Sequence, residues 1–260
     1  MPITTEYAKY FMDPELNHSS GYFQTPETSL DDAQRAKVTA ILDACRIEPG
    51  MRLLDVGCGW GATARAAARD YGASVVAITI EDDHLSYALE AEKDQVGASR
   101  IDYRLQRWED FDEPVDRIVC INAFENFTEK KAFLEHCRRI LPEGGVMVML
   151  AVTAQRPMFR VVSRQQVITT AEEAGFDVDV SESLADHYVR TLEHYCANIT
   201  AHLAEVASFR GADRAKEDIE WYETCAEFLR TGMNDMFEFT FTARAERSNG
   251  VEDATDTRSG

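Results

Sequence analysis

Hydrophobic positions along the chain follow two patterns, short apolar runs typical of strands and longer stretches with helical spacing. The short runs predict strands at residues 52–56, 74–80, 101–105, 117–121, 146–152, 176–180 and 238–243. The helical spacing predicts helices at residues 62–71, 83–93, 129–141, 164–174, 184–206 and 213–231. Alternating strands and helices predict the α/β class, a mostly parallel sheet covered by helices on both faces, with residues 238–243 as a closing antiparallel edge strand.

The same pattern divides the chain into three parts. Residues 1–50 predict an N-terminal cap with one amphipathic helix, which begins after Ser29 and ends at the turn Pro49-Gly50. Residues 51–245 form the main domain, with an inserted helical segment at about 184–231. Residues 246–260 contain almost no apolar side chains, which predicts a disordered tail.

Composition narrows the class of protein. Hydrophobic residues make up 45% and charged residues 28%, as in ordinary globular domains. The longest apolar stretch, near residues 145–152, is far shorter than the roughly 20 residues that a membrane helix needs. The N-terminus has no basic stretch followed by an apolar run, so no signal peptide is expected. We therefore expect a cytoplasmic protein without an integral membrane segment.

Charge and cysteine spacing exclude several kinds of partner. The net charge of −19 repels nucleic acid and anionic lipid, so neither is an expected partner. The 6 cysteines form no CxxC pair, which argues against zinc and against a disulfide framework. No metal site is predicted, and the sequence carries no prediction of oligomeric state.

A glycine turn directly after the first predicted strand is the strongest chemical feature. In Asp55–Gly61 (DVGCGWG), alternating glycines let the backbone turn tightly and let a ligand approach without Cβ clashes. The dinucleotide fingerprint is G-x-G-x-x-G, whereas this turn has an acid followed by G-x-G-x-G. The carboxylate of Asp55 suits a cationic ligand such as the amino-acid end of a sulfonium cofactor. The alternative is a turn with a structural role only.

Together with other motifs, this turn resembles the first motif of class I S-adenosylmethionine-dependent methyltransferases. More narrowly, the chain resembles the cyclopropane fatty acid and mycolic acid synthase family, from about Tyr10 to Thr242. The similar segments are FMDPELNHSSGYF, EPGMRLLDVGCGWGAT, RWEDFDEPVDRIVCINAFENF, HYVRTLEHY and YETCAEFLRTG. The resemblance implies a Rossmann-like fold and S-adenosylmethionine as the cofactor.

The resemblance also implies cofactor-binding positions. Tyr22, Ser19 and Ser20 would lie over the cofactor, Gly57, Cys58, Gly59 and Gly61 would meet its methionine part with Asp55 behind them, Thr79 would reach the ribose, and Trp108 and Glu109 would hold the adenine. His84 stands where the family has a glutamine, and Glu81 or Asp82 would bond the ribose hydroxyls in its place. For Trp108 the alternative is an aromatic residue of the core.

Glu125 is the candidate catalytic residue. It follows the fourth predicted strand, at the sheet edge where α/β proteins bind ligands, and a carboxylate there can stabilise a cation or take a proton. The resemblance adds Ser20, Tyr188 and Cys225, which would surround a bicarbonate ion that acts as the base. The ring of Tyr188 can also face a cation. Cys225 can equally be a buried structural thiol.

Three departures from the family argue against ring formation. Asn126 replaces the histidine of a Glu-His pair, and Leu150 stands where another histidine is expected. The stretch after Thr153 is too short for the long lid of mycolate synthases. These differences weaken the prediction of a bound bicarbonate and of a very long acyl chain.

The shortened stretch carries Arg156, Arg160 and Arg164, spaced by four residues. On a helix, this spacing places three guanidinium groups along one face. They form either a solvated face paired with acidic neighbours or a site for an anionic head group such as a phosphate or diphosphate.

The leading hypothesis is methylation of a carbon–carbon double bond through a carbocation, in a lipid, an isoprenoid-diphosphate-like compound or another specialised metabolite. Three alternatives remain: N-methylation of a small amine, cyclopropane formation on a fatty acyl chain, and a catalytically degraded partner protein that only binds the cofactor.

Overall fold

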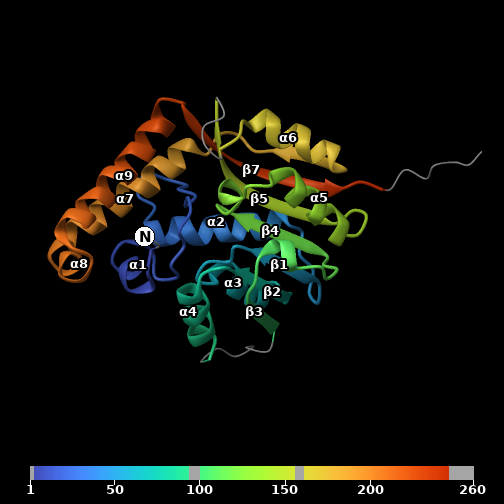
Figure 1. Cartoon of the computed structure of the whole chain (residues 1–260), viewed down its shortest axis with the longest axis horizontal. Coiled ribbons are helices and arrows are strands. Elements are labelled where there is room, and N and C mark those ends of the chain that lie inside the picture. The colour runs from blue at the N-terminus through green and yellow to red at the C-terminus, as the bar shows by residue number, and fades with distance from the viewer. Residues whose placement is uncertain (1–2, 94–99, 156–160, 246–260) are drawn as a thin grey trace, which may run out of the picture.

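The computed structural model describes residues 3–93, 100–155 and 161–245, and its centre is one twisted sheet (Figure 1). The strands of this 7-stranded sheet are β1 (Arg52–Val56), β2 (Ser74–Thr79), β3 (Ile101–Leu105), β4 (Arg117–Ile121), β5 (Val146–Ala154), β6 (Phe176–Val180) and β7 (Asn234–Ala243). Their order is β3-β2-β1-β4-β5-β7-β6. Strands β1 to β5 are parallel, as the alternation of strands and helices predicted.

Strand β7 is the antiparallel member of the sheet. It pairs with β5 on one side and with β6 on the other. The predicted fold class is therefore confirmed, but β6 and not β7 occupies the outermost position. The alternation of β7 buries Phe237, Phe239 and Phe241 on one face of the sheet, in the core that α5 (Lys130–Ile140) and α6 (Arg164–Glu173) cover.

Helices cover both faces of the sheet. On one face, α2 (Leu30–Ala44) and α3 (Ala62–Asp70) bury apolar side chains against β1, β2 and β5. On the other face, α5 and α6 do the same. The remaining sheet-side helix, α4 (Asp82–Glu92), follows β2.

A third apolar core, which we call the helical cap, lies beside the carboxyl ends of the strands. It is built from α1 (Thr5–Phe11), α7 (Ala185–Ala201), α8 (Leu203–Arg210) and α9 (Ala212–Arg230), which gather on the left in Figure 1. The sequence did not predict α1, whose first turn is capped by the side chain of Thr4. The predicted helix at 184–206 is divided at His202 into α7 and α8.

Within the described residues, no helix is long and apolar enough to cross a membrane. The predicted disordered tail at 246–260 lies outside the described residues.

Candidate functional site: a cofactor cavity at the carboxyl ends of the strands

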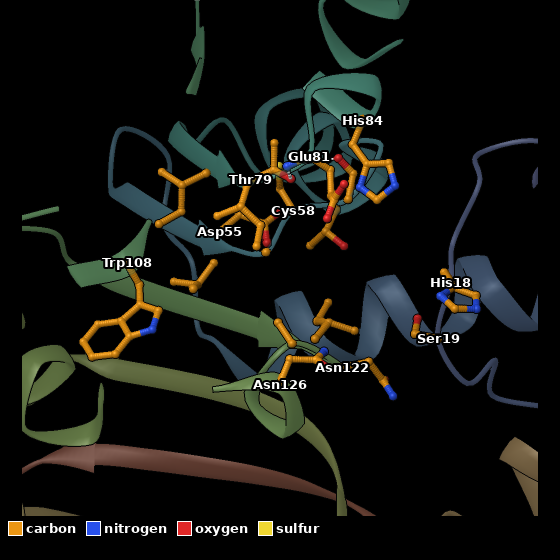
Figure 2. Close-up of a pocket in the computed structure, with 18 of the residues that line it drawn as sticks. His18, Ser19, Asp55, Cys58, Thr79, Glu81, His84, Trp108, Asn122 and Asn126 are labelled. Atoms are coloured by element: carbon orange, nitrogen blue, oxygen red, sulfur yellow. Dashed lines mark hydrogen bonds between the residues drawn. The ribbon is translucent and has the colours of Figure 1, made fainter. Parts of the chain in front are cut away.

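A cavity of about 930 Å³ opens where β1, β2 and β4 end. Its wall includes the glycine turn after β1, the start of α4, the segment around Trp108 and the segment 16–19 of the N-terminal part. Figure 2 shows Trp108 at one end of this cavity and His18 and Ser19 at the other. Ligands of open α/β sheets bind at this edge, so the position and size suit a nucleoside cofactor.

The turn after β1 is held in a backbone conformation that favours glycine. Gly57 has φ +74°, and a Cβ added there would lie 2.6 Å from the Cβ of Ala123. The N–H groups of Gly57 and Cys58 both donate to the carbonyl of Ile78, which ties the turn to β2. Gly61 caps α3 in the left-handed conformation, without a side-chain capping bond. The turn therefore brings backbone rather than side chains to the cavity.

Asp55 places a buried carboxylate in the cavity wall. The residue is 2% exposed, and its Oδ2 has no hydrogen-bond partner among the described residues. Burial raises the pKa of Asp55 to about 7, while the nearby Lys37 opposes this rise. A buried acceptor without a donor is costly, so a ligand that brings a positively charged donor completes this site. The ammonium of S-adenosylmethionine fits that requirement, and the positive charge of its sulfonium suits the same acidic surroundings.

The Trp108 end of the cavity is apolar and has a charged edge. Trp108 is 9% exposed, and its indole packs edge-on against Phe133, with the ring centroids 5.3 Å apart. Trp108 belongs both to the apolar core that α5 and α6 cover and to the cavity wall. Its place in the core therefore does not exclude the predicted contact with the adenine. Glu109 is exposed and pairs with Arg107 at 2.7 Å. This combination of an aromatic face and a carboxylate suits a purine ring.

Most of the predicted cofactor positions meet at this cavity. Its wall contains Ser19, Asp55, Gly57, Cys58, Gly59, Thr79, His84, Trp108 and Glu109. His84 packs at a tilt against Trp60, with 3.9 Å between the ring centroids, and burial lowers its pKa, so it is a neutral ring in the wall. Glu81 also faces the cavity (Figure 2).

Three predicted positions are not part of the cavity wall. The hydroxyl of Ser20 donates to the carbonyl of Gly21, and the hydroxyl of Tyr22 donates to Glu238 Oε2 at 2.9 Å. Gly61 lies behind the turn, where an added Cβ would meet Tyr103. Both hydroxyl groups thus donate to other protein atoms, Ser20 to its neighbour in the chain and Tyr22 to β7, and the cofactor contacts of Ser20 and Tyr22 stay predictions.

Glu125 lies beyond the cofactor cavity, where β4 has ended and β5 continues. The N–H of Val152 in β5 donates to Glu125 Oε1 at 2.5 Å. Strand β4 has ended at this point, so the carboxylate accepts the hydrogen bond that a carbonyl of a neighbouring strand would otherwise accept. The other oxygen, Oε2, is buried without a partner among the described residues. Burial raises the pKa of Glu125 to about 7, opposed by the bond from Val152. The side chain thus presents one free carboxylate oxygen near neutral pH.

Two other predicted catalytic residues share this neighbourhood. Burial raises the pKa of the Tyr188 hydroxyl, and the nearby Cys225 and Glu125 raise it further. Tyr188 contacts both the core of the helical cap and the core under α2, so it lies at their junction. Cys225 packs against the helical cap, and burial raises its pKa to about 11, which keeps it a thiol.

Of the three predicted arginines, only Arg164 belongs to the described residues. Arg156 and Arg160 lie outside the described residues. Arg164 is the first residue of α6, and its guanidinium stacks on the ring of Phe237 at 4.8 Å. Because α6 begins at Arg164 after its cap Ser163, this helix does not present the three arginines on one face. Arg164 is not part of the cavity wall.

Sequence reasoning missed several polar residues of the cavity wall, among them Lys37, His18 and Asn122. Lys37 interrupts the apolar stripe of α2, which was an available sign that it is buried for a reason. Asn122 directly follows β4 and has φ +50°, with its Oδ1 unpartnered in the described structure. Nowhere in residues 3–93, 100–155 and 161–245 do three or more histidine, cysteine or acidic side chains gather as a metal site.

The fold and the cavity define the class of protein, a class I S-adenosylmethionine-dependent methyltransferase. Comparison with known proteins gives the family. The family model "Mycolic acid cyclopropane synthetase" matches residues 3–162 and 155–239. The chain belongs to this family.

Individual relatives agree with this assignment. Cyclopropane mycolic acid synthase 1 of Mycobacterium tuberculosis is 32% identical over 92% of this chain and 93% of its own length. The structure of the cyclopropane synthase MmaA2 from Mycobacterium tuberculosis superposes with a TM-score of 0.89 at 27% identity, over 92% of this chain and 94% of that one. Mycolic acid cyclopropane synthase CmaA1, solved with SAH and CTAB, gives a TM-score of 0.88 at 30% identity, over 92% and 94%.

Proposed function

We propose that this methyltransferase transfers a methyl group to a carbon–carbon double bond of a lipid-like acceptor. The names of the relatives, cyclopropane mycolic acid synthases, support an acceptor of this kind. The observation that carries the proposal is the position of Glu125. A buried carboxylate with one unpaired oxygen lies just past the cofactor cavity, next to an aromatic ring.

Bound S-adenosylmethionine supplies an electrophilic methyl group, which the π electrons of an alkene take while the electron pair of the broken C–S bond remains on sulfur. The acceptor then carries a positive charge on its second alkene carbon. Glu125 stabilises this charge, and the ring of Tyr188 adds its negative π face. Glu125 Oε2 then accepts a proton from a carbon next to the cation, and the C–H electron pair forms the new double bond.

The departures from the family favour a methylated alkene over a ring. Leu150 is fully buried in the apolar core, and Asn126 is an amide, so neither position offers a base. Ring closure requires loss of a proton from the transferred methyl group instead of from a chain carbon. The connection from β5 to α6 spans only residues 155–163, and the two segments matched by the family model overlap in this stretch. Such a short connection supports an acceptor that is smaller than a full mycolic chain.

The test is transfer of label from methyl-labelled S-adenosylmethionine to a panel of acceptors. The panel contains unsaturated fatty acyl lipids, isoprenyl diphosphates, amines and saturated lipids as controls. We expect label in an unsaturated acceptor, and proton NMR of the product separates a methylated alkene from a cyclopropane. Label in amines alone would contradict the proposal, and so would binding of the cofactor without transfer to any acceptor.

The pH dependence of turnover is a second expected result. Because the base must be ionised, kcat at saturating cofactor and acceptor should rise about tenfold per pH unit below the Glu125 pKa of about 7 and level off above it. Saturating cofactor removes the effect of Asp55, which titrates in the same range but acts on cofactor binding. A kcat that is flat from pH 5.5 to about 8 would exclude Glu125 as the base.

A further inference from the structure

Lys37 is a lysine of α2 whose ammonium is buried in the wall of the cofactor cavity. The residue is 1% exposed, and it lines the cavity together with Ser19 and Asp55. Its Nζ donates to Asn17 Oδ1 at 3.0 Å and to Ser19 Oγ at 2.9 Å. No carboxylate of the described residues forms an ion pair with it, although Asp13 and Asp55 are near enough to favour its charge. A buried cation without a direct counterion is costly.

The partners of Lys37 are held rigidly. Asn17 is fixed by Asp13, whose Oδ2 accepts from Asn17 Nδ2 at 2.9 Å and whose Oδ1 accepts from the Asn17 N–H at 2.8 Å. The carbonyl of Ser19 accepts from Gln34 Nε2 at 2.6 Å. These hydrogen bonds hold both acceptors of Lys37 in place at the cavity wall.

The hydrogen bonds leave two donors for a ligand. An ammonium only donates, so Ser19 Oγ is the acceptor in its bond with Lys37 and its own hydrogen must point elsewhere. Ser19 lies on the cavity wall (Figure 2), so that O–H is available to a ligand in the cavity. Lys37 has three N–H bonds, and two are used. The two donors left over, the third N–H of Lys37 and the O–H of Ser19, suit the two oxygens of an anionic group.

Asp55 provides the opposite charge in the same cavity. Its unpartnered Oδ2 needs a donor, as described above, and Figure 2 shows Asp55 and Ser19 both facing the cavity, from β1 and from the N-terminal segment. A ligand with an ammonium and a carboxylate on one carbon carries both missing partners. The methionine part of the cofactor has this zwitterion.

We propose that Lys37 and Ser19 bind the carboxylate of the methionine part of S-adenosylmethionine, while Asp55 binds its ammonium. Lys37 and Asp55 then distinguish the complete cofactor from nucleosides that lack one of these charges. The proposal concerns the cofactor alone and does not depend on the identity of the acceptor.

The test compares two ligands that differ by the carboxylate. S-Adenosylmethionine has both charges of the zwitterion, and decarboxylated S-adenosylmethionine keeps the amine and loses the carboxylate. Calorimetry of the Lys37→Met variant should show the Kd of S-adenosylmethionine raised about 100-fold, because a buried charge pair loses one partner. The Kd of the decarboxylated ligand should stay unchanged or fall, so the preference of the wild type for the carboxylate should disappear.

Two variants complete the experiment. Arg35→Met removes an exposed cation from the same helix and should leave both Kd values unchanged. Ser19→Ala removes a single hydroxyl and should raise the Kd of S-adenosylmethionine about tenfold without affecting the Kd of the decarboxylated ligand. If Lys37→Met shows no cooperative thermal transition and is therefore not folded, Ser19→Ala alone tests the proposed carboxylate site. Equal losses for both ligands, or no loss for either, would overturn the proposal.

Discussion

Replacing Glu125 by glutamine is expected to lower kcat about 1,000-fold, the middle of the range for removal of a positioned general base. Glutamine has the same shape, and its carbonyl oxygen can still accept the hydrogen bond that Val152 donates to Oε1. The substitution therefore removes the negative charge and the proton acceptor but keeps the packing. The measurement is kcat and KM for the acceptor at saturating cofactor, with the Kd of S-adenosylhomocysteine by calorimetry.

The matched control for this variant is Glu143→Gln, in the exposed turn before β5. It makes the same chemical change away from the site and should keep wild-type kcat. Because Glu125 does not line the cofactor cavity, the Kd of S-adenosylhomocysteine should be the same in all three proteins. An unchanged kcat in Glu125→Gln would remove this residue from the reaction, and a weakened cofactor affinity would indicate a structural role.

Replacing Gly57 by alanine is expected to lower the free energy of unfolding by about 3 kcal/mol, from left-handed strain and overpacking together. The backbone has φ +74°, and the new methyl group would lie 2.6 Å from the Cβ of Ala123. Ala123 also lines the cavity, so relief of the clash moves the cavity wall. Urea unfolding should show the loss of stability, and calorimetry should show a weaker affinity for S-adenosylmethionine.

Gly144→Ala separates strain from the clash. Gly144 has φ +72°, almost the same as Gly57, but an added Cβ has no atom within 4 Å. This variant should lose only about 1 kcal/mol of stability, from the conformation alone, and should bind the cofactor normally. Equal losses of stability in the two variants would show that the contact with Ala123 contributes nothing.

The accuracy of the sequence predictions follows how local each feature is. The strand, glycine turn and helix over residues 52–70 are contiguous, so propensity and turn chemistry predict them together. The short helix α1 was missed because its aromatic residues gain their stability from α7 and not from their own pattern. Strand β7 was placed at the edge because its alternation predicts a strand but not its neighbours.

The candidate site shows the same division. Asp55 lies near the end of β1 and Glu125 follows β4 closely in the chain, and the order of elements was enough to bring both carboxylates to one edge of the sheet. Tyr22 was expected over the cofactor, but its hydroxyl is taken by Glu238, far away in the sequence. No local pattern predicts such a bond, because it depends on how α7 and β7 pack against the N-terminal segment.

By itself the sequence determined the parallel sheet, the glycine turn and the S-adenosylmethionine cofactor, since each depends on neighbouring residues with a specific backbone conformation. The tertiary structure decided which charges meet. No local pattern brings Lys37 and Asp55 together, and only the packing of α2 places the ammonium of Lys37, with Asp55, in the cavity wall. Burial determines what such charged groups bind, because a group that water no longer solvates must find its partner in the protein or in the ligand.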